Sequence, residues 1–188
     1  MQLPPFNRAR LPATMLSTPA RLVFLMTLAP YYWVSAQTKL GDGFWGFLNP
    51  SDGAYYQIFP HAYEAAGFDK TAMALWQDLM VLAGTWGEFI LPFLLIIGFM
   101  TRATAIGMIG FVIVQTVVDL FGHGAITDPV ALGAFFDKNP SSLLTDQRLL
   151  WIMLLFVLVI HGGGIISVDR LICRSHWARH WVLRWAVR

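Results

Sequence analysis

The feature that most limits how this chain folds is an apolar stretch of 22 residues, from Leu79 to Met100, which contains a single charged side chain. A helix of about 20 apolar residues crosses the roughly 30 Å of hydrocarbon in a bilayer. The charged residue, Glu88, lies near the middle, where a carboxylate costs about 2.5–3.5 kcal/mol by insertion scales. We therefore expect Glu88 to face other helices or water, and to act as the catalytic acid or base.

The composition of the whole chain is typical of an integral membrane protein. Hydrophobic residues make up 56% of the 188 and charged residues only 13%, with a mean hydropathy of +0.57. These values argue against a soluble domain. A single cysteine, Cys173, excludes an intramolecular disulfide and a cysteine metal cluster. The sequence has no GxGxxG, P-loop or HExxH motif, so nucleotide binding and zinc-dependent hydrolysis lack support.

Four apolar segments predict the fold, an all-α transmembrane four-helix bundle. Their expected ranges are residues 22–38, 79–100, 103–120 and 149–166. Because only Thr101 and Arg102 separate the second segment from the third, we expect these two helices to form a tight antiparallel hairpin. Pro30 and Pro92 each remove a backbone donor and should kink their helices.

The distribution of Lys and Arg predicts the orientation of the bundle. With both termini and the Arg102 hairpin on one side, that side carries nine of the 13 basic residues. The positive-inside rule then places both termini in the cytoplasm. The opposite loops, about residues 39–78 and 119–148, are rich in aromatic residues and are expected to form short interfacial helices.

An alternative interpretation treats the first apolar segment as a secretory signal. Val34, Ser35 and Ala36 resemble a small-residue cleavage site, and cleavage there would leave three spans. The bulky rings of Tyr31, Tyr32 and Trp33 crowd that site and favour a retained helix. Sequencing the amino terminus of the purified protein distinguishes the two.

The C-terminal segment, residues 172–188, has the pattern of a basic amphipathic helix on the cytoplasmic membrane surface. Tryptophans recur there at i, i+4 and i+8, and arginines cover the other faces. The expected surface residues are Trp177, Trp181, Trp185, Arg174, Arg179 and Arg184. A frayed basic tail is the alternative. In this hydrophobic context the tail indicates a lipid bilayer as partner rather than nucleic acid.

Polar residues on the second and third segments predict a pocket that opens toward the outer side. Asp78, Thr85 and Glu88 share one helix face, and a second polar stripe follows at i, i+4 and i+8 on the next helix. We expect Glu88 at the floor of this pocket. Its other residues are predicted to be Lys39, Asp78, Trp86, Gln115, Asp119 and His123. Alternatively, Lys39 pairs with Asp78 or Asp119 and these contacts only fix helix register.

Two further residue sets are interpreted structurally. His161 has no second buried histidine with which to ligate haem, and the remaining histidines lack a convincing metal spacing, so we expect no bound metal. Four glycines spaced by three along their helices predict close helix approach. They are Gly84, Gly87, Gly107 and Gly110.

Several short motifs lie near the ends of the predicted helices. They are Arg21, the pair Lys39 and Leu40, the run GEFILPFLLIIGFMTRATA from Gly87 to Ala105, and GGGIISVDRL from Gly162 to Leu171. In these motifs the chain resembles the DoxX family of small four-helix bacterial membrane proteins. Some members are associated with thiosulfate:quinone oxidoreduction, and others with membrane complexes that handle oxidative or thiol stress.

The resemblance implies an inner-membrane subunit of a quinone-linked redox system, with a protein partner or further copies of itself. We expect no tightly bound cofactor and take quinone as the candidate ligand. Because no paired cysteines and no haem or flavin site are visible, the electrons must come from the partner or the substrate. The alternative function is a non-catalytic scaffold, or a carrier of small molecules or peptides, that partners a soluble enzyme.

Overall fold

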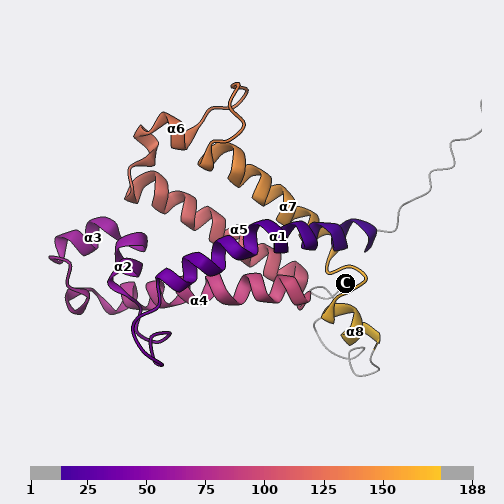
Figure 1. The fold of residues 1–188 in the computed structure, drawn as a ribbon, viewed down its shortest axis with the longest axis horizontal. Coiled ribbons are helices and arrows are strands. Elements are labelled where there is room, and N and C mark those ends of the chain that lie inside the picture. The colour runs from indigo at the N-terminus through magenta and orange to yellow at the C-terminus, as the bar shows by residue number, and fades with distance from the viewer. Residues whose placement is uncertain (1–13, 175–188) are drawn as a thin grey trace, which may run out of the picture.

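The computed structural model describes residues 14–174 and, within that range, contains helices and no strands, which confirms the predicted all-α fold. Four long helices form the body of the protein (Figure 1). They are α1 (Thr14–Thr38), α4 (Leu75–Ile97), α5 (Thr101–Val117) and α7 (Arg148–His161). α1 packs against α4 and α7, and α5 packs against the same two helices.

Short helices fill the two long loops and the region after α7. They are α2 (Asp52–Ile58), α3 (Pro60–Ala65), η1 (Lys70–Ala72), η2 (Val118–Gly122), η3 (Ala125–Thr127), α6 (Pro129–Leu132), η4 (Leu143–Gln147) and α8 (Val168–Arg174). The elements η2 and η4 are π-helical turns that extend α5 and precede α7. The predicted short helices of the loops are therefore present.

Three helical segments are long and apolar enough to cross a membrane, namely Leu75–Ile97, Thr101–Gly122 and Leu143–His161. α1 has 25 residues but is not among them. Polar side chains such as Arg21, Ser35 and Gln37 lower its apolar character. The chain is thus a helical protein with three candidate membrane spans in its described part.

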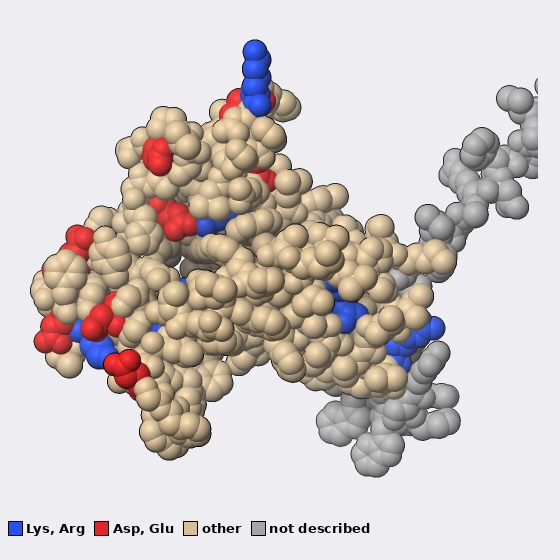
Figure 2. All heavy atoms as spheres, viewed as in Figure 1, with Lys and Arg blue, Asp and Glu red and all other residues tan. Residues whose placement is uncertain are grey.

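The surface of the long helices agrees with a membrane environment. On the face shown in Figure 2, Asp and Glu gather over the loop end together with some Lys and Arg, other Lys or Arg side chains lie near α8, and a largely uncharged band lies between the two groups. Large apolar side chains are exposed along the helices, among them Met26, Phe93 and Phe156. Extended apolar surface of this kind is rare in soluble monomers and normal for helices in lipid.

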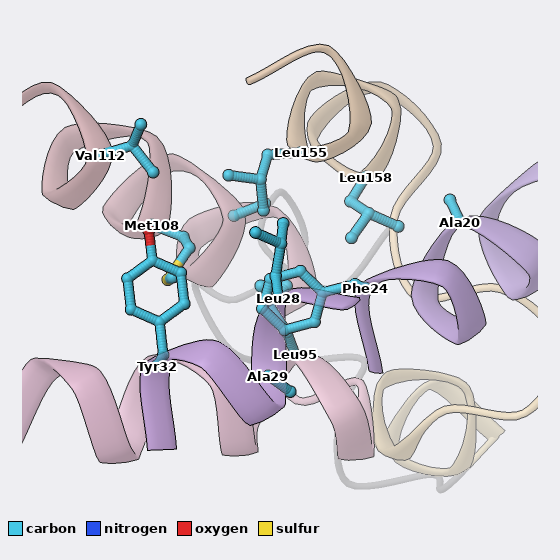
Figure 3. Close-up of a cluster of buried hydrophobic side chains, with 11 residues drawn as sticks. Ala20, Phe24, Leu28, Ala29, Tyr32, Leu95, Met108, Val112, Leu155 and Leu158 are labelled. Carbon is cyan, nitrogen blue, oxygen red and sulfur yellow. The ribbon is translucent and has the colours of Figure 1, made fainter. Parts of the chain in front are cut away.

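One apolar core lies where the four long helices meet. Its side chains point inward from α1, α4, α5 and α7 (Figure 3), and they include Phe24, Leu28, Tyr32, Leu95, Met108, Val112, Leu155 and Leu158. A smaller second core holds α2 and α3 against the beginning of α4, and it consists of Ala54, Tyr55, Tyr63, Met73 and Val81. The second core fixes the first loop over the end of the bundle where α1 ends and α4 begins.

Several helix boundaries differ from the sequence prediction. α1 begins at Thr14 rather than at residue 22, and α4 begins at Leu75 rather than at residue 79. For two other boundaries the backbone gives the reason. The α4–α5 turn lies at Gly98–Met100 rather than at Thr101 and Arg102, because Gly98 (φ 70°) and Met100 (φ 45°) adopt the left-handed region. Thr101 already opens α5. α7 ends at His161 rather than at residue 166, because Gly162 has φ 73° and cannot continue the helix.

The two prolines do not end their helices. α1 and α4 continue as helices through Pro30 and Pro92.

The predicted C-terminal helix lies almost entirely outside the part of the chain that the structure describes. The tail residues Trp177, Trp181, Trp185, Arg179 and Arg184 lie outside the described residues, and Arg174 is known only as the last residue of α8. The amphipathic tail stays a prediction.

Candidate functional site

A cavity of about 620 Å³ lies between α1, α4 and α5 toward the loop end of the molecule. It forms because α4 and α5 diverge from their common turn, which leaves a V-shaped space that α1 closes on one side (Figure 1). Apolar side chains such as Ile58, Phe111 and Leu144 form most of its wall. Its polar lining residues are Tyr31, Ser35, Lys39, Gln57, Glu88, Gln115, Asp119 and His123.

Lys39 and Glu88 form a buried ion pair on the α1 side of this cavity. The Lys39 Nζ donates to Glu88 Oε2 at 2.8 Å and to Oε1 at 3.1 Å, and both side chains are 5% exposed. Ser35 joins the pair, since its Oγ accepts from Lys39 Nζ at 2.7 Å and donates to Glu88 Oε1 at 3.2 Å. The three side chains form a closed polar group inside an apolar wall.

Helix periodicity explains how this group is assembled. Ser35 and Lys39 are four residues apart at the end of α1, so both face α4. On α4, Glu88 belongs to the buried face that also carries Val81, Thr85 and Pro92. Lys39 therefore pairs with Glu88, rather than with Asp78 or Asp119 as in the alternative drawn from the sequence.

A second ion pair borders the same cavity and joins α7 to η2, the turn that extends α5. Arg148, at the start of α7, donates from Nη2 to Asp119 Oδ2 in η2. The Arg148 side chain is 2% exposed, and its Nε and Nη1 have no hydrogen-bond partner among the described residues. Because an unpaired buried N–H is costly, this guanidinium is the least satisfied polar group near the cavity.

A short hydrogen-bond network connects α1 to α5 between the two ion pairs. Gln115 Nε2 donates to Tyr31 Oη at 2.9 Å, and Tyr32 Oη donates to Gln115 Oε1 at 3.3 Å. Tyr31 and Gln115 line the cavity, whereas Tyr32 lies in the apolar core. One wall of the cavity is therefore polar along much of its length, and the other walls are apolar.

Five of the seven predicted site residues line this cavity, and they are Lys39, Glu88, Gln115, Asp119 and His123. Asp78 does not, because its Oδ1 accepts a hydrogen bond from Tyr55 Oη of α2 at 2.9 Å. Trp86 does not either: it precedes Glu88 by two residues and so lies on the opposite side of α4. Its Nε1 donates to Phe47 O in the first loop at 2.9 Å.

Five polar residues at or near the cavity were not predicted, and two of them left a signal in the sequence. Tyr31 and Ser35 precede Lys39 at spacings of four, the same stripe pattern that pointed to Gln115 and Asp119. Tyr32, Gln57 and Arg148 left none. Arg148 stands at the border of an apolar segment, where a loop charge is expected, and only the tertiary fold brings it to Asp119.

The helix glycines divide between two roles. Gly84, Gly107 and Gly110 all line the cavity, and a Cβ added to Gly110 would meet nothing within 4 Å. A Cβ on Gly87 would lie 3.2 Å from the Phe111 ring, and one on Gly107 would lie 3.4 Å from Leu91 Cδ2. Gly87 and Gly107 therefore fit the predicted close approach of α4 and α5, whereas the prediction is wrong at Gly110.

The opposite end of the bundle holds another group of buried charges, here termed the turn-end cluster, formed by Arg21, Thr101 and Asp169. The Arg21 guanidinium donates to four backbone carbonyls, those of Leu95, Ile96, Gly163 and Ile166. Asp169 accepts from Met100 N at 2.6 Å, Thr101 N at 2.8 Å and Thr101 Oγ1 at 2.7 Å. These contacts fasten the α4–α5 turn to the segment after α7.

In the part of the chain that the structure describes, no three His, Cys, Asp or Glu side chains come together as metal ligands would. No protein-family model, no curated protein and no solved structure matches this chain. The resemblance to the DoxX family therefore rests on the sequence motifs alone. The cavity and its polar wall are the features of the molecule that indicate a function.

Proposed function

We propose that the protein is a DoxX-like inner-membrane subunit of a quinone-linked redox system and that its cavity binds the quinone ring. The observation that carries this proposal is a largely apolar cavity of about 620 Å³ with the buried Lys39–Glu88 pair in its wall. Sites for small lipophilic molecules combine apolar walls with a few placed polar groups. A quinone ring has matching chemistry, with two flat apolar faces and carbonyl oxygens at its edge.

The polar wall supplies what a quinone needs from its binding protein. Reduction of a quinone to a quinol takes up two electrons and two protons. Lys39 donates hydrogen bonds and stabilises negative charge as it develops on a carbonyl oxygen. Glu88, once protonated from water, passes one proton to that oxygen, and the second proton reaches the other carbonyl oxygen from water. The two electrons come from a protein partner or from a sulfur-containing donor, either sulfide that is oxidised to sulfur or two thiosulfates that are oxidised to tetrathionate.

The proposal includes a fourth span and a defined orientation. α1 has 25 residues, about 37 Å at 1.5 Å per residue, and packs along α4 and α7 with apolar residues such as Val23 and Met26 exposed. This length and surface support a span despite the polar residues that α1 carries. The nine-to-four distribution of basic residues supports cytoplasmic termini.

A non-catalytic carrier or scaffold is the second candidate, and one observation favours it. Lys39, Ser35 and Glu88 already satisfy one another, which is what a purely structural polar contact requires. In that case the cavity holds a lipophilic molecule without reacting with it. The difference between the two candidates is whether Glu88 takes part in proton transfer.

Quinone binding in nanodiscs tests the proposal. The wild-type protein should bind a short-chain benzoquinone and should support its reduction when sulfide or thiosulfate is the donor. Glu88→Gln should lower the reduction rate by about a hundredfold or more, the usual contribution of a general acid. Glu64→Gln makes the same change at an exposed position in α3 and should have no effect.

The outcomes separate the candidates. Absence of both quinone binding and quinone reduction in wild-type protein rejects the redox proposal. Binding that persists in wild type and in Glu88→Gln, without any reduction in either, favours the carrier. The thermal unfolding of each variant is measured alongside, so that a loss of activity is not confused with a loss of fold.

A further inference from the structure

We infer that the cavity is filled sideways from the bilayer, through a window between α4 and α5, by a molecule with a polar ring and a hydrocarbon tail. The ring lies at the Lys39–Glu88 pair, and the tail extends through the window into lipid. This inference rests on the proposed function and adds the ligand class to it. A water-soluble ring or a small anion alone does not use the window.

The outer end of the V-shaped space is covered by α2 and α3. The His123 Nε2 lies 3.0 Å from Gln57 O, and the His61 Nε2 lies 3.3 Å from Phe121 O, so both loop helices reach η2 and the residue that follows it. A Cβ on Gly122 would stand 3.1 Å from Pro60 Cγ. These contacts make α2 and α3, which belong to the first loop, a packed lid over this end of the cavity.

α1 closes the back of the same space. Tyr31, Ser35 and Lys39 line the cavity at successive turns of α1, and the last two contact Glu88. Toward the turn, α4 and α5 converge, and a Cβ on Gly87 would already meet the Phe111 ring at 3.2 Å. Ala131, Leu143 and Leu144 of the second loop also line the cavity. The side with no such covering segment is the gap between α4 and α5 that faces away from α1.

Residues on the rim of that gap both line the cavity and are exposed on the outer surface. They are Met80, Ala83, Gly107, Gly110 and Val114. All five are apolar or lack a side chain, and all belong to candidate membrane spans. In a bilayer such a surface faces acyl chains. The window therefore opens to hydrocarbon and not to water.

The window also lies at the depth of the ion pair. Glu88 stands ten residues before Gly98, and Gly110 stands ten residues after Met100, so the two positions flank the cavity at similar distances from the α4–α5 turn. Space is open at this level, since a Cβ on Gly110 would meet no atom within 4 Å. A ring bound at Glu88 can extend a tail past Gly110.

The test compares one ring with and without a tail. Nanodisc-embedded protein is titrated with a decyl-substituted benzoquinone and with the same ring lacking the decyl chain, with binding corrected for partition into lipid. Gly110→Leu places a side chain in the window and should weaken binding of the decyl compound by about tenfold or more. The tailless ring should change by less than about threefold.

Matched variants keep the test independent of folding. Val117→Phe adds bulk to an exposed position of α5 outside the cavity lining and should change neither affinity. Gly110→Ala and Gly110→Val give a graded series, in which the affinity for the decyl compound should fall as side-chain volume rises. This series replaces Gly110→Leu as the deciding measurement if that variant fails to fold.

The results distinguish the window from the proposed function. Equal weakening of both compounds by Gly110→Leu, or weakening of neither, overturns the window while the wild-type affinity for the ring leaves the proposed function intact. Wild-type protein that binds neither compound removes the proposed function, and the inference falls with it.

Discussion

The two ends of the bundle hold buried charges in different ways. In the turn-end cluster, Arg21 and Asp169 bond mainly to backbone groups, and neither lines the cavity described above. At the other end, Lys39 and Glu88 bond to each other and border about 620 Å³ of space. Charges that bond to backbone are fixed by the fold, whereas side-chain pairs beside a cavity remain available to a ligand. We assign structure to the first set and chemistry to the second.

The largest expected effect is at Arg21. Arg21→Met leaves the carbonyls of Ile96, Gly163 and Ile166 without their donor, whereas Leu95 O keeps the backbone N–H of Gly98 at 3.2 Å. At about 1–3 kcal/mol for each unsatisfied group, the loss approaches the whole stability of a marginally stable domain. The variant should not accumulate as folded protein, as measured by size-exclusion chromatography after extraction.

Arg102→Met is the control for Arg21→Met. Arg102 is a second arginine at the same end, but it donates a single bond, to Ile160 O at 2.9 Å. The control should fold and melt within about 1–1.5 kcal/mol of wild type. Wild-type stability of Arg21→Met itself would contradict the structural assignment of the turn-end cluster.

The next effect is at the ion pair of the cavity. Lys39→Met leaves Glu88 as an unpaired buried charge and should cost about 3–5 kcal/mol. Because Glu88→Gln removes that charge, the double variant should recover most of the loss, and a double-mutant cycle of unfolding free energies measures this coupling. Additive effects of the two substitutions would show that the pair is not formed.

Replacing one glycine at each end of the bundle with alanine should change the stability in opposite directions. Gly98 has φ 70°, and its Cβ would lie 2.6 Å from Ser167 Cβ, so Gly98→Ala should destabilise the protein by about 1–3 kcal/mol. Gly110 is helical and faces open space, so Gly110→Ala should stabilise it by about 0.5–1 kcal/mol. Equal effects at the two positions, from denaturant unfolding, would remove the contrast between the ends.

The smallest expected effect is the loss of one tyrosine titration step in the lid formed by α2 and α3. Burial and the nearby Asp78 carboxylate raise the pKa of Tyr55 from 10.0 to about 12. Because the folded pKa lies above the unfolded one, this contribution to stability is complete below pH 10 and is lost as the pH rises toward 12. Tyrosinate absorbance should show a step near pH 12 that Tyr55→Phe removes and that Tyr56→Phe, at the exposed neighbour, leaves in place.

The sequence predicted helices better than it predicted contacts. Apolar length located α4 and α5, because a span needs about 20 apolar residues whatever its neighbours are. Helix periodicity placed Glu88 and Gln115 on faces that meet at one cavity, but it could not choose the partner of Lys39 or bring Arg148 to Asp119. Those pairings depend on how α1 packs on α4 and how α7 packs on α5, which are contacts between segments far apart in the sequence.

The bonds of Arg21 impose an order on assembly. This residue lies in the first helix, yet one of its acceptors, Gly163, is 142 positions further along the chain. A nascent chain emerges amino terminus first, so the guanidinium is made long before that acceptor has been synthesised. Leu95 and Ile96 of α4 supply two of its acceptors earlier, and the set is complete only when the segment after α7 arrives. A ribosome-stalled chain that ends before residue 163 should therefore be a preferred substrate for membrane quality-control proteases.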